Sequence, residues 1–342
     1  MHHPLRLTID RLAIQANWRW LQGRAGVAAG AAIKADSYGL GAREAMAALL
    51  EVGCRDFFVS TWAEADALGS LLEDVSLVVL HGVGPDDASV GSQAVARPCL
   101  NTARQVARWR EVAPGRTCDV MIDTGMNRLG LRPAEIDTLD GLVIDTLHSH
   151  LACGDEESAM NAMQLERFRA VASAVPARRY SLANSAGICL GSDYSFDLVR
   201  PGISLYGGVP RAEAAGNIRQ VARVEAQIVQ RRRIPRGESC GYGATFIAKE
   251  DTEAAILNVG YADGYLRGFS SRGSAFAGEF ALPVIGRISM DLIGVSLDAS
   301  PQLKEGDWVE IDYDLPSASE QSGLSQYELL TTLGSRFERR WV

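Results

Sequence analysis

The chain has 342 residues, of which 47% are apolar and 22% are charged, a composition typical of an ordinary globular protein. This composition excludes intrinsic disorder, collagen and coiled coil for most of the chain. Lysine and arginine number 34 against 42 aspartate and glutamate residues, and the resulting net charge of -8 argues against nucleic acid and anionic membrane as partners.

The near-terminal sequence and the cysteines indicate a cytoplasmic protein. The longest uncharged apolar stretch near the N-terminus runs from Ala25 to Ile33, well short of the roughly 20 residues that a membrane-spanning helix needs. The 6 cysteines are scattered singly, and no CxxC spacing occurs. A disulfide framework is not needed at this length, so we expect a reducing compartment and cysteines that act as small core residues.

From about residue 28 to 208, short β-rich runs alternate with segments of helical periodicity. This alternation predicts βα units around a parallel sheet, and the spacing fits a compact (β/α)8 barrel of the TIM type. An open doubly wound sheet is the alternative, but no GxGxxG sequence follows the first strand. We expect strands over residues 27–35, 56–60, 76–80, 117–123, 145–150, 179–183 and 198–206, and helices over 43–52, 62–72, 102–112 and 158–175.

After about residue 215 the pattern changes to short β-type runs punctuated by glycine, proline and aspartate. These runs predict a mainly β C-terminal domain, with a helical segment near the end of the chain. We place the barrel at 1–213 and the β-rich domain at 214–342, with 1–10 as a segment that could join the β domain. The β runs lie at 221–231, 253–259, 282–285, 291–297 and 308–311, and the helical segment lies at 325–333.

Lys34 interrupts the first apolar strand and must either reach water or take part in chemistry. A desolvated lysine has a lowered pKa and can attack a carbonyl carbon to form a Schiff base. At the carboxyl end of a barrel strand it would face the usual position of an active site. Taken alone, a lysine at a strand end is more often structural.

Lys34 opens the first of eight motifs that together resemble the bacterial alanine racemases. The motifs occur in the order and with the spacing of that family and cover nearly the whole chain. They are KADSYGLG (34–41), DTGMNRLG (123–130), HSHLA (148–152), ANS (183–185), VRPGISLYG (199–207), GYGATF (241–246), GYADGYLRG (260–268) and GRISMD (286–291). The resemblance implies a pyridoxal 5'-phosphate enzyme of fold type III, with a cofactor-binding barrel, a β domain and a head-to-tail homodimer.

The resemblance assigns the two bases that racemisation requires, one for each face of the substrate carbon. Lys34 would hold pyridoxal phosphate covalently and serve the D side. Tyr242 matches the second base, which serves the L side from the partner subunit. His150 is similar to the family histidine beside the cofactor and is a candidate for tuning Tyr242.

Further matches suggest how the cofactor is held. Arg200 matches the arginine that contacts the pyridine nitrogen, where a permanently protonated group weakens the cofactor as an electron sink. The phosphate would be bound by backbone amides and hydroxyls rather than by many charges. The residues for it are the amides of Gly202 and Ile203, the hydroxyl of Ser185 and the phenol of Tyr38.

Four residues match substrate positions, and two positions depart from the family. Arg128 would lie near the substrate carboxylate, Tyr261 at the substrate entrance, and the pair Met290 and Asp291 at the carboxylate pocket, Met290 through its backbone N–H. Met121 stands where many members have a carbamylated lysine that orients this arginine, so Asn127 or a bound anion would have to orient Arg128. Ser335 stands where the family often has a phosphate-binding tyrosine.

Several functions stay open at this point. The leading one is the interconversion of L-alanine and D-alanine, by either a biosynthetic enzyme that supplies peptidoglycan precursors or a catabolic one. Racemases of serine, lysine or arginine share most of these motifs. A barrel decarboxylase is disfavoured by Arg200, and a non-catalytic pyridoxal phosphate-binding protein by the β domain. His148 and His150 share a strand face, but we expect no metal site.

Overall fold

The computed structural model describes residues 3–72 and 74–342 and divides into two compact units. The barrel unit comprises Ile14–Arg219. The β unit combines the segment that ends at Ala13 with Gln220–Val342.

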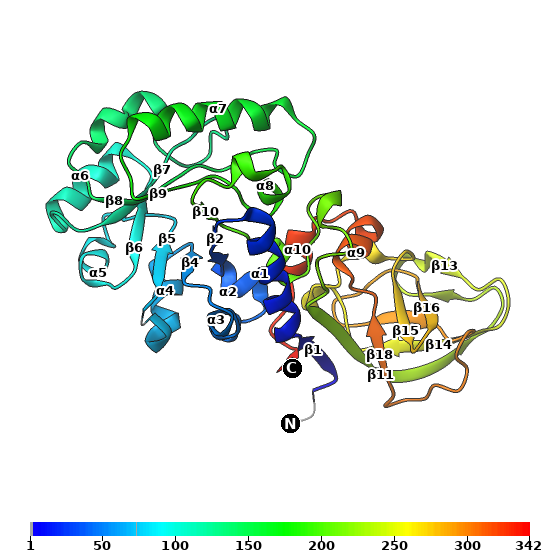
Figure 1. Ribbon diagram of the computed structural model, residues 1–342. Coiled ribbons are helices and arrows are strands. Elements are labelled where there is room, and N and C mark those ends of the chain that lie inside the picture. The colour runs from blue at the N-terminus through cyan, green and yellow to red at the C-terminus, as the bar shows by residue number, and fades with distance from the viewer. Residues whose placement is uncertain (1–2, 73) are drawn as a thin grey trace. The chain divides into compact units, whose positions relative to one another are not determined.

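Seven parallel strands in sequence order form the sheet of the barrel unit (Figure 1). Helices or 3₁₀ turns follow the strands, as expected for successive βα units. The strands are β3 (Ala31–Ala32), β4 (Asp56–Val59), β5 (Ser76–Val79), β6 (Arg97–Leu100), β7 (Cys118–Met121), β8 (Ile144–His148) and β9 (Arg179–Ser181). The helices are α1 (Arg11–Ala25), α2 (Lys34–Gly39), α3 (Ala42–Glu51), α4 (Trp62–Leu68), α5 (Ala88–Gln93), α6 (Ala103–Val112), α7 (Ala159–Ala174) and α8 (Ser185–Cys189), with 3₁₀ turns η1 (Gly69–Leu72), η2 (Pro133–Leu139), η3 (Ser192–Tyr194), η4 (Ile203–Tyr206) and η5 (Ala212–Ala214).

An eighth strand closes the barrel. Strand β10 (Leu198–Val199) pairs in parallel with β2 (Ala28–Ala29), which continues into β3 after Gly30. On its other side, the Arg200 N–H donates to the Ala183 carbonyl at 2.9 Å, next to β9. The predicted barrel followed by a β domain is confirmed.

Three of the differences from the predictions concern the strands of the barrel unit. Strand β6 was not predicted, because its sequence RPCL opens with a charge and a proline. The first expected strand ends before Lys34, which instead begins the turn α2. The last expected strand stops at Val199, and the chain continues into η4.

Apolar side chains fill the inside of the barrel and the layer between the sheet and its helices. Ala32, Phe58, Val78, Cys99, Met121 and Leu198 form one buried cluster from six different strands. A larger cluster packs β7, β8 and α6 against α7, with Trp109 and Phe168 fully buried. These clusters fix the strand ends on which the candidate site is built.

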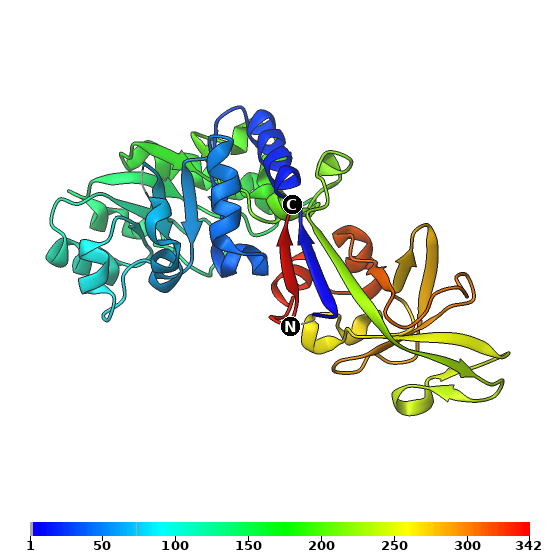
Figure 2. The same cartoon turned by 90° about the horizontal axis from the view of Figure 1, so that it is seen from below.

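The β unit contains an eight-stranded sheet, mainly antiparallel. Its order is β14-β17-β16-β15-β18-β11-β1-β19, and an additional β14–β11 pairing closes six strands into a ring. Figure 2 shows β1 and β19, from opposite ends of the chain, beside the long β11. The elements are β1 (Leu5–Ile9), β11 (Ala222–Ile234), β12 (Ser239–Cys240), β13 (Phe246–Ile247), β14 (Thr252–Leu257), β15 (Ser274–Ala277), β16 (Phe280–Ile285), β17 (Ile293–Ser296), β18 (Trp308–Ile311), β19 (Glu338–Trp341), α9 (Leu315–Ser322), α10 (Gln326–Thr331), and 3₁₀ turns η6 (Tyr242–Ala244), η7 (Tyr261–Asp263) and η8 (Arg267–Phe269).

Over residues 3–72 and 74–342, the structure contains no helix that is long and apolar enough to span a membrane.

Candidate active site

Lys34 is followed by four residues in a left-handed helical turn. Ala35, Asp36, Ser37 and Tyr38 have φ values of 50, 52, 51 and 58°. None of them is glycine, and for L-residues this conformation costs about 1–2 kcal/mol per residue. The surrounding structure must therefore hold the turn in place.

Hydrogen bonds and a ring contact hold this turn. The Ala35 N–H donates to Glu64 Oε1 at 3.0 Å, and the Ala42 N–H donates to Asp36 Oδ1 at 2.7 Å. The Tyr38 ring packs against Tyr206 with ring centroids 5.0 Å apart. The position of Lys34 is thus set by contacts to two further segments of the barrel unit.

Positive groups gather at the carboxyl ends of the barrel strands, which we call the upper end. Burial lowers the pKa of Lys34, the Arg128 guanidinium lowers it further, and Glu64 opposes the shift. Burial lowers the pKa of His150 to about 3, with added effects of Arg200, Arg128 and Lys34. His150 is therefore neutral at pH 7, and more of Lys34 is unprotonated than in free lysine.

Arg200 is deeply placed at the upper end, with only 7% of its surface exposed. Its guanidinium donates to the hydroxyl of Ser181 and, at 2.6 Å, to the carbonyl of Ser149. Burial lowers the pKa of Arg200 to about 10, so the side chain keeps its proton at neutral pH. None of its hydrogen-bond partners in the described chain is a carboxylate.

The segment after β10 meets the start of α8 and the left-handed turn. Ser185 Oγ accepts hydrogen bonds from the N–H groups of Gly202 and Ser204 at 2.9 and 3.3 Å. A Cβ atom at Gly202 would lie 2.2 Å from Tyr38 Oη, so a larger residue there would have to displace the Tyr38 ring. The hydroxyl of Ser204 is buried and has no hydrogen-bond partner in the described structure. This is a compact cradle of backbone amides and hydroxyls around Gly202 and the neighbouring Ile203.

Arg128 lies in the loop after β7, which Asp123 organises. Asp123 Oδ1 accepts the N–H groups of Gly125 and Asn127 at 2.8 and 3.0 Å. The Asn127 amide donates to the Gly125 carbonyl at 3.3 Å, and Arg128 has no hydrogen bond or ion pair within the described residues. Met121, at the end of β7, is buried in the apolar cluster inside the barrel.

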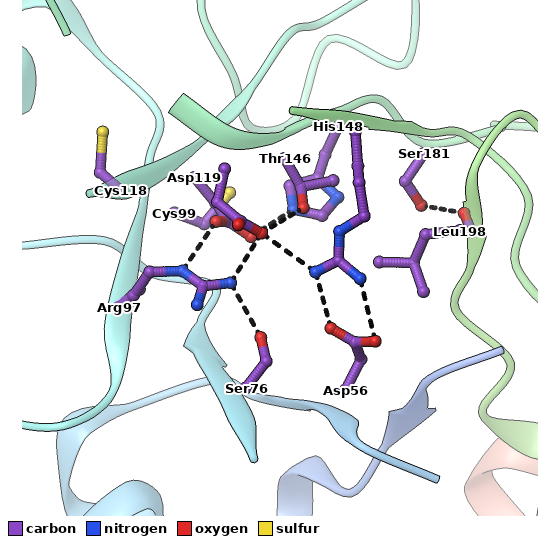
Figure 3. A network of polar contacts seen from close by, with 12 residues as sticks. Asp56, Ser76, Arg97, Cys99, Cys118, Asp119, Thr146, His148, Ser181 and Leu198 are labelled. Carbon is purple, nitrogen blue, oxygen red and sulfur yellow. Dashed lines mark hydrogen bonds and ion pairs between the residues drawn. The ribbon is translucent and has the colours of Figure 1, made fainter. Parts of the chain in front are cut away.

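A buried polar network lies at the amino ends of the strands, which we call the lower end (Figure 3). Arg179 binds both oxygens of Asp56 at 3.0 and 2.7 Å, and Arg97 bridges Asp119 and Asp145 at 3.2 and 2.9 Å. This network was not predicted from the sequence because its members are far apart in the chain. Charged residues at the starts of successive strands were the available signal.

His148 belongs to this network rather than to the group around Lys34. Its Nε2 lies 2.8 Å from Asp119 Oδ2, and both residues are fully buried. Burial lowers the pKa of His148, whereas its hydrogen bond to Asp119 opposes this shift. His148 is thus a neutral donor to a carboxylate and is separated in role from His150.

In the β unit, Tyr242 lies on an exposed turn, with 68% of its surface accessible. Gly241 and Gly243 on either side have φ values of 79 and 72°. A Cβ atom at Gly243 would lie 3.2 Å from Arg287 Nη1, so the Arg287 guanidinium packs beside this turn. Arg287 was not singled out in the sequence, although it belongs to the GRISMD motif.

The other candidates of the β unit lie on adjoining loops. The Tyr261 and Ala262 N–H groups donate to the carbonyls of Ser289 and Met290, both at 3.0 Å. The side chain of Met290 is exposed, and Asp291 makes an ion pair with Arg336. Ser335 is exposed and follows α10.

Two family models together match almost the entire chain. The alanine racemase N-terminal domain matches residues 9–210, and the alanine racemase C-terminal domain matches residues 221–341. The chain belongs to the alanine racemase family. Neither match supports a decarboxylase or a single-domain binding protein.

Individual alanine racemases resemble the chain over nearly its full length. A catabolic alanine racemase from Agrobacterium fabrum is 40% identical, over 98% of this chain and 92% of the relative. The biosynthetic alanine racemase of the same organism is 39% identical, over 99% and 94%. A crystal structure of alanine racemase from Bartonella henselae, with covalently bound pyridoxal phosphate, has a TM-score of 0.93 and 35% identity and covers 100% of both chains.

Proposed function

We propose that this member of the alanine racemase family interconverts L-alanine and D-alanine with pyridoxal 5'-phosphate as its cofactor. The observation that carries the proposal is Lys34, a lysine with a lowered pKa on a rigid turn at the upper end of the barrel. The matched relatives with near-complete coverage support alanine over serine, lysine or arginine as the substrate.

The residues around Lys34 fit this cofactor. The cradle of Ser185, Gly202 and Ile203 offers backbone amides and hydroxyls to a phosphate, and the buried hydroxyl of Ser204 lacks a partner among the residues that the structure describes. Tyr38 contacts the same glycine. Arg200, which keeps its proton, is suited to accompany an unprotonated pyridine nitrogen. When bound through Lys34, the cofactor withdraws electrons from the substrate carbon and makes its proton acidic.

The chain's own residues then have to bind the carboxylate and move one proton on each face. We assign Lys34 to the D side and Tyr242 to the L side. His150, neutral at pH 7, provides a ring that can accept or donate a hydrogen bond without adding charge. Arg128, Tyr261 and the Met290–Asp291 pair are assigned to the substrate, with Arg128 attracting its carboxylate.

We further propose a head-to-tail homodimer in the cytoplasm, in which Tyr242 completes the site of the partner subunit. Several large apolar side chains of the β unit are exposed, which favours a surface covered by a second copy. They are Tyr242, Ile247, Met290 and Leu292, exposed by 68, 59, 53 and 40%.

The test is an optical-rotation assay with L-alanine and added pyridoxal phosphate. The wild-type protein is expected to bring the rotation to zero, and Lys34→Ala and Tyr242→Phe are each expected to abolish this change. The same assay is run separately with L-serine, L-lysine and L-arginine as alternative substrates. Racemisation of one of these in place of alanine would overturn the substrate assignment.

Mixing the two inactive variants tests the shared site. Randomly reassembled dimers are half heterodimers, and each would contain one intact site, so about a quarter of the wild-type activity should return. No recovery after confirmed subunit exchange would mean that Lys34 and Tyr242 do not act across two chains.

A further inference from the structure

Three loops of the β unit meet at very short backbone distances. They are residues 260–264, 289–291 and 332–336, and two of them carry the substrate candidates Tyr261, Met290 and Asp291. A Cβ atom at Gly260 would lie 2.4 Å from the Met290 carbonyl oxygen. A Cβ atom at Gly334 would lie 2.7 Å from the Ala262 carbonyl oxygen. The backbone of residues 260–264 is therefore in direct contact with both other loops.

One guanidinium joins these loops through their side chains. Arg336 donates from Nε and Nη2 to the two oxygens of Asp263, both at 2.6 Å. Its Nη1 donates to Asp291 Oδ1 at 2.6 Å. The hydrogen bonds that Arg336 donates to Asp263 and Asp291 raise its pKa above the ordinary value, so its charge is permanent.

The two halves of this contact differ in burial. Asp263 is fully buried, and its Oδ2 also accepts the Gly260 N–H at 3.0 Å. A buried carboxylate with three hydrogen bonds is a structural anchor for the loop. Asp291 has 50% of its side chain exposed, so its ion pair adds little to the stability of the fold. The Arg336–Asp291 contact therefore calls for a role other than stability.

The backbone next to Asp291 offers a donor for a ligand. The Met290 N–H has no hydrogen-bond acceptor among the described residues, whereas its carbonyl is fixed by Ala262. A free carboxylate at Asp291 would repel an anion that approached this N–H. With Arg336 bound to it, the Asp291 charge is largely compensated and its side chain is held at one position.

We propose that Arg336 is a positioning residue for the substrate carboxylate, acting through Asp291 and the adjoining Met290 N–H. The proposal rests on the proposed function. Arg336 itself does not touch the substrate. It fixes the loop that binds the carboxylate and removes the repulsion that an unpaired Asp291 would exert.

The test compares Arg336→Gln, Arg336→Lys and the double variant Arg336→Gln with Asp291→Asn, all as holoenzymes. We expect Arg336→Gln to raise the KM for L-alanine at least tenfold while kcat falls less than threefold. The double variant should bring the KM most of the way back to the wild-type value, because the unpaired charge of Asp291 is gone. Arg336→Lys retains the charge beside Asp263 but cannot bind both carboxylates, so it should fold and show a smaller rise in KM.

Binding of propionate, which is alanine without its amino group, provides a readout that does not depend on turnover. Calorimetry should show that Arg336→Gln weakens propionate by the same factor as it raises KM and leaves the neutral propionamide unchanged. A lowered Tm with unchanged KM and propionate affinity, or no rescue by Asp291→Asn, would overturn the proposal. If Arg336→Gln does not fold, Arg336→Lys decides between these outcomes.

The wild-type protein separates this inference from the proposed function. A wild-type holoenzyme that racemises no amino acid contradicts the proposed function itself. Equal propionate affinity in the wild type and Arg336→Lys contradicts only the role of Arg336.

Discussion

The two ends of the barrel handle charge in opposite ways. At the lower end, Asp56, Asp119 and Asp145 each bind arginine side chains directly, so the positive and negative charges compensate one another. At the upper end, Lys34, Arg128 and Arg200 lie around a neutral His150, and no carboxylate binds any of the three directly in the described structure. The lower end is built for stability and the upper end for an anionic ligand, which agrees with the usual division of labour in such barrels.

The largest expected effect is the loss of activity at the upper end. Lys34→Ala should reduce racemisation by at least about a thousandfold, since both cofactor attachment and one base are removed. The Tm of the protein without cofactor should stay the same or rise, because one of several clustered positive charges is gone. Lys304→Ala, at an exposed lysine, is the control and should leave both values unchanged.

The lower end should respond in the opposite way. Asp145→Ala leaves Arg97, Arg178 and Arg179 short of one carboxylate and should lower the free energy of unfolding by about 3–5 kcal/mol. The KM of the folded enzyme should change less than twofold. Denaturant titration measures the loss, and Asp193→Ala, at an exposed ion pair, should cost less than about 1 kcal/mol. A large change in KM would mean that the two ends are coupled.

The pH dependence of stability should show His150 at the upper end and Asp145 at the lower end in different pH ranges. The folded state keeps His150 neutral down to a pKa of about 3, whereas the unfolded chain binds a proton near pH 6.5. Stability of the cofactor-free protein should therefore fall as the pH drops below 6.5, by up to about 1.4 kcal/mol per pH unit from this residue. His148 contributes in the same direction, so His150→Asn should reduce the slope without removing it.

The depressed pKa of Asp145 acts at lower pH. Burial alone would raise this pKa, but the hydrogen bond donated by Arg178 and the charge of Arg97 hold it well below the ordinary range. Its contribution to stability is complete above about pH 4 and is lost as the pH falls through the folded value. The His150 prediction has its own test. If His150→Asn leaves the slope of the unfolding free energy against pH unchanged between pH 6.5 and 5, the lowered pKa of His150 is contradicted.

The smallest expected effect concerns bicarbonate. Met121 cannot be carbamylated, and it is buried among apolar side chains. Activity should therefore be the same in buffer depleted of carbon dioxide and in buffer with added bicarbonate. An initial rate that clearly depends on bicarbonate would contradict this prediction and would indicate another carbamylated group near Arg128.

The sequence predicted elements with strong apolar patterns and failed where polar contacts decide the structure. The helix expected over 158–175 is observed at Ala159–Ala174, begun by the Ser158 side chain, which accepts the Met160 N–H. Strand β6 escaped prediction because Arg97 opens it, and that arginine is stabilised by carboxylates on two other strands. Such long-range partners are invisible in a local pattern.

The candidate site shows the same division. The motif around Lys34 indicated the residue but not its backbone, since nothing in KADSYGLG signals four consecutive left-handed residues without glycine. The hydrogen bonds from Arg336 to Asp263 and Asp291 were also not predicted, because these residues lie 73 and 45 positions before Arg336 in the chain. Residue types were readable from the sequence, whereas their mutual placement required the folded chain.

The left-handed turn has a stereochemical consequence. At Ala35 the backbone angles of 50 and 47° are close to the mirror image of an ordinary α-helix. That region is strained for an L-residue but is the favoured one for its mirror-image counterpart. A semisynthetic chain with D-alanine at exposed position 35 should therefore fold at least as stably as the natural one. D-alanine, which is one product of the proposed reaction, is thus also the residue that the backbone at position 35, next to Lys34, accommodates with least strain.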